Sequence, residues 1–202
     1  MEGSSSPEPQ RGKARIDLRW IPLGAGGTGF VRMNGRAYEA LRSRLERRRP
    51  LALYHTALEV HAPEGRFVIE NAWPSPDRDT SSRGVVVEGP VFDRRIARFR
   101  VFRYEVRRWR DGTVTDLDDA VGGPQCVSRD PGTASYLLEQ VDFVPAMVWG
   151  RDEIGAGEMW NSNSVISWLL DRSDLNPGAL QPPAGGRAPG WRSGILAAHR
   201  SD

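Results

Sequence analysis

The regular pattern of apolar and polar residues in this chain begins near Arg15. Ile16, Leu18 and Trp20 alternate with polar residues, which is the period of a strand with one buried face. Pro22 and the glycines that follow it are typical of a strand end, so we expect the first strand to stop there.

Later segments repeat this strand pattern. Further strands are predicted at residues 51–60, 66–72, 85–88, 98–109 and 113–116. The first two are joined by a turn-like segment, residues 61–65, and Asp111 with Gly112 forms a tight turn between the last two. Short strands joined by short turns favour antiparallel pairing.

Apolar residues recur at helical spacing in three segments. Helices are predicted at residues 35–49, 133–141 and 163–172. Pro50 ends the first, and an Asp-Pro-Gly start signal at residues 130–132 precedes the second. The third has a broad apolar face. Together, strands and helices predict an α+β fold in which an antiparallel sheet packs against helices.

The same pattern divides the chain into three parts. Residues 1–14 show no apolar periodicity, so we expect a disordered arm that cannot offset the entropy of ordering. Residues 15–175 are predicted to form a single α+β domain. Residues 176–202 are rich in proline and glycine and are expected to pack on that domain as a tail, with one strand at residues 195–198.

Composition excludes several classes of protein. The formal net charge is only +2, which is a weak argument for nucleic acid, and Cys126 is the single cysteine, expected to serve packing. Without cysteine pairs, neither a disulfide nor a cysteine-rich zinc site is expected, and no metal or cofactor is predicted. No window approaches the roughly 20 apolar residues of a membrane span, and no secretory signal is recognised, so a cytoplasmic location is expected. The oligomeric state is not set by the sequence.

Two polar motifs are candidates for chemistry. The first is Tyr54-His55-Thr56 on a predicted strand, and the second is Trp160 to Ser164 at the start of the last long helix. A hydroxyl at a helix N-terminus lies beside free N–H groups that stabilise an oxyanion. A histidine on an adjacent strand could accept its proton, and a polar residue on the next strand could orient the imidazole.

The order of these motifs resembles that of circularly permuted papain-like hydrolases, which include the NlpC/P60-like and lecithin:retinol acyltransferase-like proteins. In that group a histidine strand precedes an Asn-Cys-Asn-type motif that opens a helix. Asn161-Ser162-Asn163-Ser164 resembles this motif with serine in the cysteine position, as in the Asn-Ser-Asn-Thr/Ser signature of an uncharacterised bacterial family. The resemblance covers residues 51–172.

The resemblance implies a serine-variant amide or ester hydrolase or acyltransferase. Ser162 would attack the substrate, His55 would act as base and Glu70 would orient it, with Glu59, His61 and Asn71 as competitors for the third role. The residues expected to bind a small molecule, peptide or lipid in the cleft are Asn161, Asn163, Ser164, Trp149, Trp160 and Tyr54. Serine is a poorer nucleophile than a thiolate and depends wholly on its base.

Other interpretations of the same residues stay open. Asn and Ser at a helix start are also ordinary N-caps, and a lone strand histidine is often a core residue. A module of the same fold could bind a peptide or lipid without catalysis. Gly24 to Gly29 fits a dinucleotide-binding spacing but lacks the helix that this motif requires. The arginine-rich stretch 94–110 would suit nucleic acid, although acidic neighbours make paired surface charges the better account.

Overall fold

The computed structural model describes residues 13–23, 39, 43–44, 47, 49–74, 83–114 and 117–200. The strands of the structure are β1 (Arg15–Pro22), β2 (Ala52–Ala62), β3 (Gly65–Ala72), β4 (Val85–Pro90), β5 (Arg103–Arg110), β6 (Gln125–Ser128) and β7 (Gly186–Arg187). The α-helices are α2 (Pro131–Gln140), α3 (Ser162–Arg172) and α4 (Trp191–Ala198). Short 3-10 turns are η2 (Ile96–Arg98), η3 (Arg100–Phe102), η4 (Leu117–Asp119), η5 (Val141–Phe143) and η6 (Pro177–Ala179).

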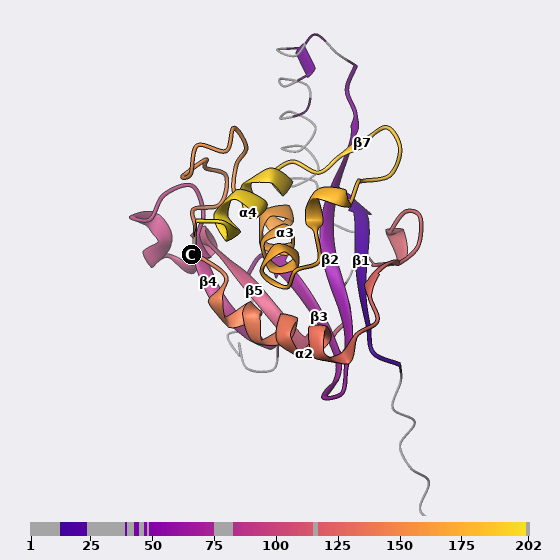
Figure 1. The fold of residues 1–202 in the computed structure, drawn as a ribbon. Helices are drawn as coiled ribbons and strands as arrows, with labels where there is room; N and C mark the ends of the chain where they lie inside the picture. The colour runs from indigo at the N-terminus through magenta and orange to yellow at the C-terminus, as the bar shows by residue number, and fades with distance from the viewer. Residues whose placement is uncertain are drawn as a thin grey trace, which may run out of the picture.

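Six strands form an antiparallel sheet in the order β4-β5-β3-β2-β1-β6 (Figure 1). The two-residue strand β7 pairs with β2 in parallel, beside the main path. β2 and β3 form the predicted hairpin, with Ala62 opposite Gly65. The predicted α+β fold, with an antiparallel sheet packed against helices, is therefore confirmed. The permuted papain-like order is not tested by this topology and stays a prediction.

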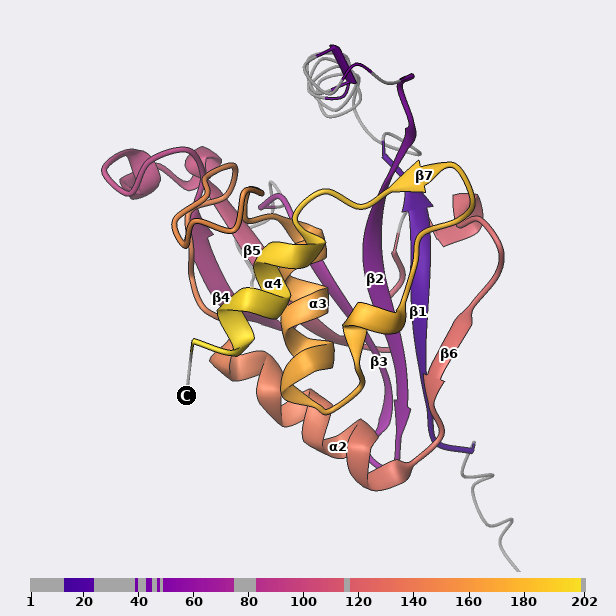
Figure 2. The same ribbon diagram turned by 45° about the horizontal axis from the view of Figure 1, so that its top comes forward.

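The helices α2, α3 and α4 cover one side of the sheet, which we call the inner side (Figures 1 and 2). The main core lies there, between the sheet and the helices. It includes Leu18, Leu58, Ile69, Val106, Leu137, Ile166 and Leu169, all fully buried. Because each buried aliphatic side chain contributes about 1.5–3 kcal/mol, this layer dominates the stability of the fold.

The other side of the sheet, here the outer side, carries charge. A small apolar cluster there contains Ile21, Ala57 and Val68. Beside it, Glu59 accepts hydrogen bonds from Arg19 and Arg66. Burial alone would raise the pKa of Glu59, but the hydrogen bonds from the two guanidinium groups lower it below its usual value. Buried charges on this side are thus paired.

The C-terminal segment is part of the packed structure. α4 packs against α3, and the Trp191 ring at its start contacts the Trp20 ring of β1 with centroids 5.2 Å apart. Gly194 of α4 lies against the Ser164 carbonyl, where any Cβ would collide. The strand predicted at residues 195–198 is wrong: these residues are helical, because the helix buries Ala197 and Ala198 on one face.

Other predictions for short segments differ from the structure or lie outside the described residues. Residues 96–102 form the 3-10 turns η2 and η3, so β5 starts only at Arg103. Residues 113–114 are not in a strand, and residues 115–116 lie outside the described ranges. The predicted disordered arm at residues 1–14, the glycine motif at 24–29 and most of the helix predicted at 35–49 also fall largely or wholly outside the described residues.

Candidate functional site

The Asn-Ser-Asn-Ser motif forms the first turn of α3. Asn161 is the N-cap, and its side chain accepts from the N–H groups of Asn163 and Ser164. The Ser164 hydroxyl in turn accepts from the Asn161 N–H at 3.0 Å, which completes a capping box. The N-cap interpretation is therefore shown directly. Ser162 is the first helical residue and is buried.

The same motif also ties three segments together. The Asn163 amide donates to the Tyr54 carbonyl and to the Pro189 carbonyl, both at 2.9 Å. Its oxygen accepts from the Thr56 hydroxyl at 3.0 Å. Asn161 also donates to Pro189, while the Ser164 hydroxyl donates to the next carbonyl, that of Gly190, at 2.8 Å. Asn161, Asn163 and Ser164 thus connect α3 to β2 and to the segment before α4.

His55 lies on the outer side of β2. Side chains alternate along a strand, and Thr56, which contacts α3, faces inward. His55 pairs across the sheet with Ile21, and Ile21 belongs to the outer apolar cluster. Burial lowers the pKa of His55 to about 4, so its imidazole is neutral and weakly basic at pH 7. The sheet separates this side chain from α3, and the predicted pairing of His55 with Ser162 is not formed.

The other two histidines of the chain are described as well, and both are distant from Ser162. His61 lies six residues beyond His55 along β2, about 20 Å at the rise of a strand. His199 contacts Asp171 at 3.1 Å, near the C-terminal end of α3. That is about 13 Å along the helix axis from Ser162. Ser162 therefore has no imidazole beside it in this structure.

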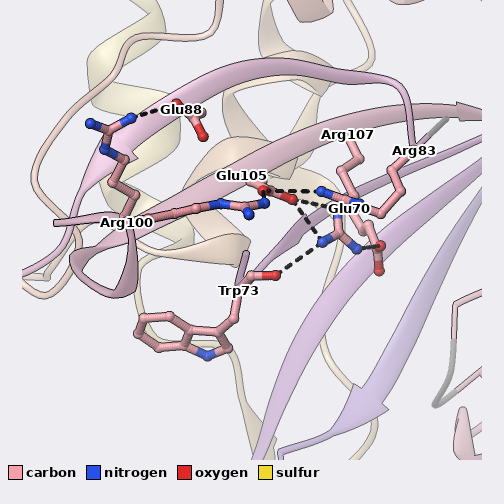
Figure 3. Close-up of polar contacts among 8 residues, drawn as sticks. Glu70, Trp73, Arg83, Glu88, Arg100, Glu105 and Arg107 are labelled. Atoms are coloured by element: carbon pink, nitrogen blue, oxygen red, sulfur yellow. Dashed lines mark hydrogen bonds and ion pairs between the residues drawn. The ribbon is translucent and has the colours of Figure 1, made fainter. Parts of the chain in front are cut away.

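Glu70 belongs to an ion cluster on the outer side. Its carboxylate accepts from Arg107 at 3.0 Å (Figure 3). Arg107 also holds the fully buried Glu105 at 2.8 Å, and Arg83 and Arg100 approach the other oxygen of Glu105. Glu70 lies on the side of the sheet opposite to α3, and its hydrogen bond with Arg107 gives it a structural role.

β2 and β3 diverge from each other near the start of α3. Their pairing ends at Leu58 and Ile69, while β3 stays paired with β5 as far as Ala72 (Figure 2). Asn71 lies in this diverging stretch and faces the same side as Ile69. Both polar atoms of its amide are buried and, within the described structure, neither has a hydrogen-bond partner. Such orphaned groups are rare in folded proteins.

Aromatic rings lie next to Asn71. Trp73, the first residue after β3, is 41% exposed, and its ring contacts Trp149 with centroids 5.9 Å apart. Trp149 contacts the buried Tyr104 at 5.8 Å, and its backbone bridges that of Trp160. Burial raises the pKa of Tyr104, whose hydroxyl donates to the Met147 carbonyl. The indole N–H of Trp160 is also buried, and it interacts with the Tyr104 hydroxyl.

We call Asn71, Trp73, Tyr104, Trp149 and Trp160 the Asn71 site. It combines a surface tryptophan, a stack of rings leading to the core and the buried amide of Asn71, which has no partner in the described structure. A ligand that brings hydrogen-bonding groups and an apolar side chain would satisfy both features. Arg107 contacts the site from the outer side of the sheet, because it donates to the Trp73 carbonyl at 3.0 Å (Figure 3).

The sequence analysis found part of this site. Trp149 and Trp160 were expected in a binding cleft, and the structure brings them together. Tyr54 was expected there too, but its ring is buried against Gly186 in the core. Asn71 was considered only as a partner for the histidine, and Trp73 was not singled out. Their two-residue spacing at the end of a predicted strand was the signal that could have joined them.

Neither a search for metal-binding side chains nor comparison with known proteins assigns a function to the site. Within the described ranges, no three His, Cys, Asp or Glu side chains gather in a way that could hold a metal ion. No helix in the part of the chain described here is long and apolar enough to cross a bilayer. Comparison with protein-family models gives no match, and searches of curated proteins and of solved structures find none either.

Proposed function

We propose that this protein is a non-catalytic module that binds a peptide at the Asn71 site. The observation that carries the proposal is the buried amide of Asn71, whose donor and acceptor both lack partners in the described structure, close to the exposed Trp73. An unpaired buried amide costs about 1–3 kcal/mol. A ligand that pairs with the amide would recover this cost on binding.

A peptide matches the chemistry of the site. Each peptide unit offers one N–H and one C=O, which are the complements of the Asn71 oxygen and nitrogen. An apolar side chain of the peptide would lie on Trp73 and Trp149, where aromatic contact area is large and rigid.

The surroundings of Ser162 favour binding over hydrolysis. The leading hypothesis from the sequence was a serine hydrolase with His55 as base. With His55 on the other side of the sheet, Ser162 has no imidazole to remove its proton. The papain-like relationship remains a prediction, and a module of that fold without catalysis is compatible with this site.

Replacing Asn71 by leucine tests the site without knowledge of the ligand. Because the change removes two unpaired polar atoms and keeps the number and branching of the side-chain heavy atoms, Asn71→Leu is expected to raise the free energy of unfolding by about 1 kcal/mol. Thr56→Val is the matched control: it removes a buried hydrogen bond to Asn163 and should lower stability by a similar amount. Denaturant unfolding measures both. A loss of stability in Asn71→Leu would give Asn71 a structural role and contradict the proposal.

Binding is measured with a library of capped tripeptides, by the change in tryptophan fluorescence. Wild type and Ser162→Ala should bind the same peptides, and Asn71→Leu and Trp73→Ala should bind them at least ten-fold more weakly. A fluorophosphonate probe provides the test for catalysis. Labelling that disappears in Ser162→Ala would show an active serine and refute the non-catalytic assignment.

A further inference from the structure

A second surface, separate from the Asn71 amide, lies on the loop between β4 and β5. Residues 91–103, here the Arg/Phe loop, contain five arginines and one aspartate. The loop carries η2 and η3 and projects from the end of the sheet, at the left of Figures 1 and 2. Its charge is therefore concentrated on a convex feature.

Three large apolar side chains of this loop are exposed to solvent. Phe92 is 53% exposed, Phe99 51% and Val101 70%. Phe92 also has φ of +62°, a left-handed conformation that is strained for an aromatic residue. Exposed aromatic and aliphatic groups gathered on one loop mark an interaction surface.

The loop is held in this shape by its own backbone. Val91 donates to the Phe102 carbonyl at 2.8 Å and closes the base of the loop. Phe99 donates to Ile96, and Phe102 donates to Phe99, which fixes the two 3-10 turns. The apolar side chains are therefore displayed by an ordered scaffold.

The arginines fall into two groups. Arg94, Arg100 and Arg103 pair with Glu153, Glu105 and Glu88. Arg95 and Arg98 are exposed and have no carboxylate partner in the described structure. The Arg98 guanidinium lies 4.8 Å from the centre of the Phe99 ring, so a cation and an apolar ring are presented together.

From these features we propose that the Arg/Phe loop docks the protein on the surface of an anionic phospholipid bilayer. Phe99, Val101 and Phe92 would enter the boundary between headgroups and acyl chains, and Arg95 and Arg98 would contact lipid phosphates. A convex loop fits a deformable flat surface. Nucleic acid is disfavoured because only two arginines are free for phosphates and valine offers no stacking.

Vesicle co-sedimentation of the full chain tests the proposal. Wild type should bind vesicles of phosphatidylcholine with phosphatidylserine, and bind pure phosphatidylcholine far more weakly. Arg95→Gln with Arg98→Gln should weaken binding about 30-fold, at about five-fold for each arginine, and make it less sensitive to salt. Phe99→Ser with Val101→Ser should weaken it at least about ten-fold.

Matched controls come from elsewhere on the surface. Tyr136→Ser on α2 and Arg129→Gln before α2 replace an exposed aromatic and an exposed arginine, and both should bind vesicles as wild type does. Circular dichroism confirms that each variant is folded. Asn71→Leu should keep vesicle binding, so failure of the peptide proposal would not affect this one.

Three outcomes would overturn the membrane assignment. One is wild type that prefers anionic vesicles no more than neutral ones. Another is an equal loss of binding in the control variants. The third is binding to poly-glutamate or duplex DNA that matches vesicle binding and survives Phe99→Ser with Val101→Ser, because that would identify an acidic macromolecule as the partner.

Discussion

His55 illustrates how burial of one side chain changes the response of the protein to pH. The pKa of its imidazole is about 4 in the folded state against 6.5 as the ordinary value. Above pH 6.5 the imidazole is neutral in both states. As the pH falls from 6.5 to 4, the unfolded chain takes up the proton first, so the folded state loses up to about 3 kcal/mol of stability.

Chemical denaturation of wild type and His55→Gln between pH 4 and pH 7 measures this effect. The variant should lose less stability on acidification, by up to about 3 kcal/mol at pH 4. Thr56→Val on the same strand is the control, since it removes no titratable group, and the pH dependence of its stability should follow wild type. Parallel curves for wild type and His55→Gln would show that His55 keeps its proton affinity on folding.

At the level of single residues, the sequence predicted those roles that depend only on residues nearby in the chain. The capping role of Asn161 needs only residues three positions away, so it could be derived. The alternation along residues 51–60 also placed His55 on one side of its strand. Which side of the sheet receives α3 depends on packing between distant segments, and no local pattern contains that information.

At the level of elements, the charged side chains of the ion cluster on β5 stabilise one another. Glu105 is fully buried and is contacted by Arg83, Arg100 and Arg107. Removing its charge would take away the carboxylate that all three guanidinium groups share, and breaking a buried pair costs about 3–5 kcal/mol. The position of Trp73 depends on the same arginine, through the bond from Arg107 to its carbonyl.

Glu105→Gln is therefore expected to lower the free energy of unfolding by about 3 kcal/mol. Glu88→Gln is the matched control on the neighbouring strand, because Glu88 pairs with Arg103 near the surface and should cost less than about 1 kcal/mol. Urea unfolding of both variants gives the comparison. Similar small losses in the two would mean that the cluster around Glu105 is not cooperative.

Strand and helix prediction succeeded where a pattern was long and regular, as in β1, the β2–β3 hairpin and α3. It failed for α4, because the glycine within this helix and the prolines before it are unfavourable for helix formation. Gly194 is there because only a residue without a side chain lets α4 approach the Ser164 carbonyl. That requirement comes from tertiary packing.

At the level of the whole molecule, α4 joins elements from both ends of the described chain. It packs on α3, and its Trp191 contacts Trp20 of β1. Gly194→Val would force α4 away from α3 because any Cβ collides with the Ser164 carbonyl. We expect a loss of about 3 kcal/mol. Hydrogen exchange should accelerate in β1 as well as in α3.

Gly178→Ala provides the comparison, since a Cβ there meets only an ordinary contact with Asn176. Its stability should stay within about 0.5 kcal/mol of wild type. Exchange that accelerates in α4 alone after Gly194→Val would mean that the helix detaches without affecting the sheet.

The contact between Trp20 and Trp191 also bears on how this protein is made. A ribosome produces β1 early and α4 last among the described elements. The inner side of the sheet is therefore fully covered only after α4 has been translated. Contacts between distant segments also slow folding. The growing polypeptide would display Leu18, Leu58 and Ile69 in the meantime, and a molecular chaperone has an apolar target during that interval.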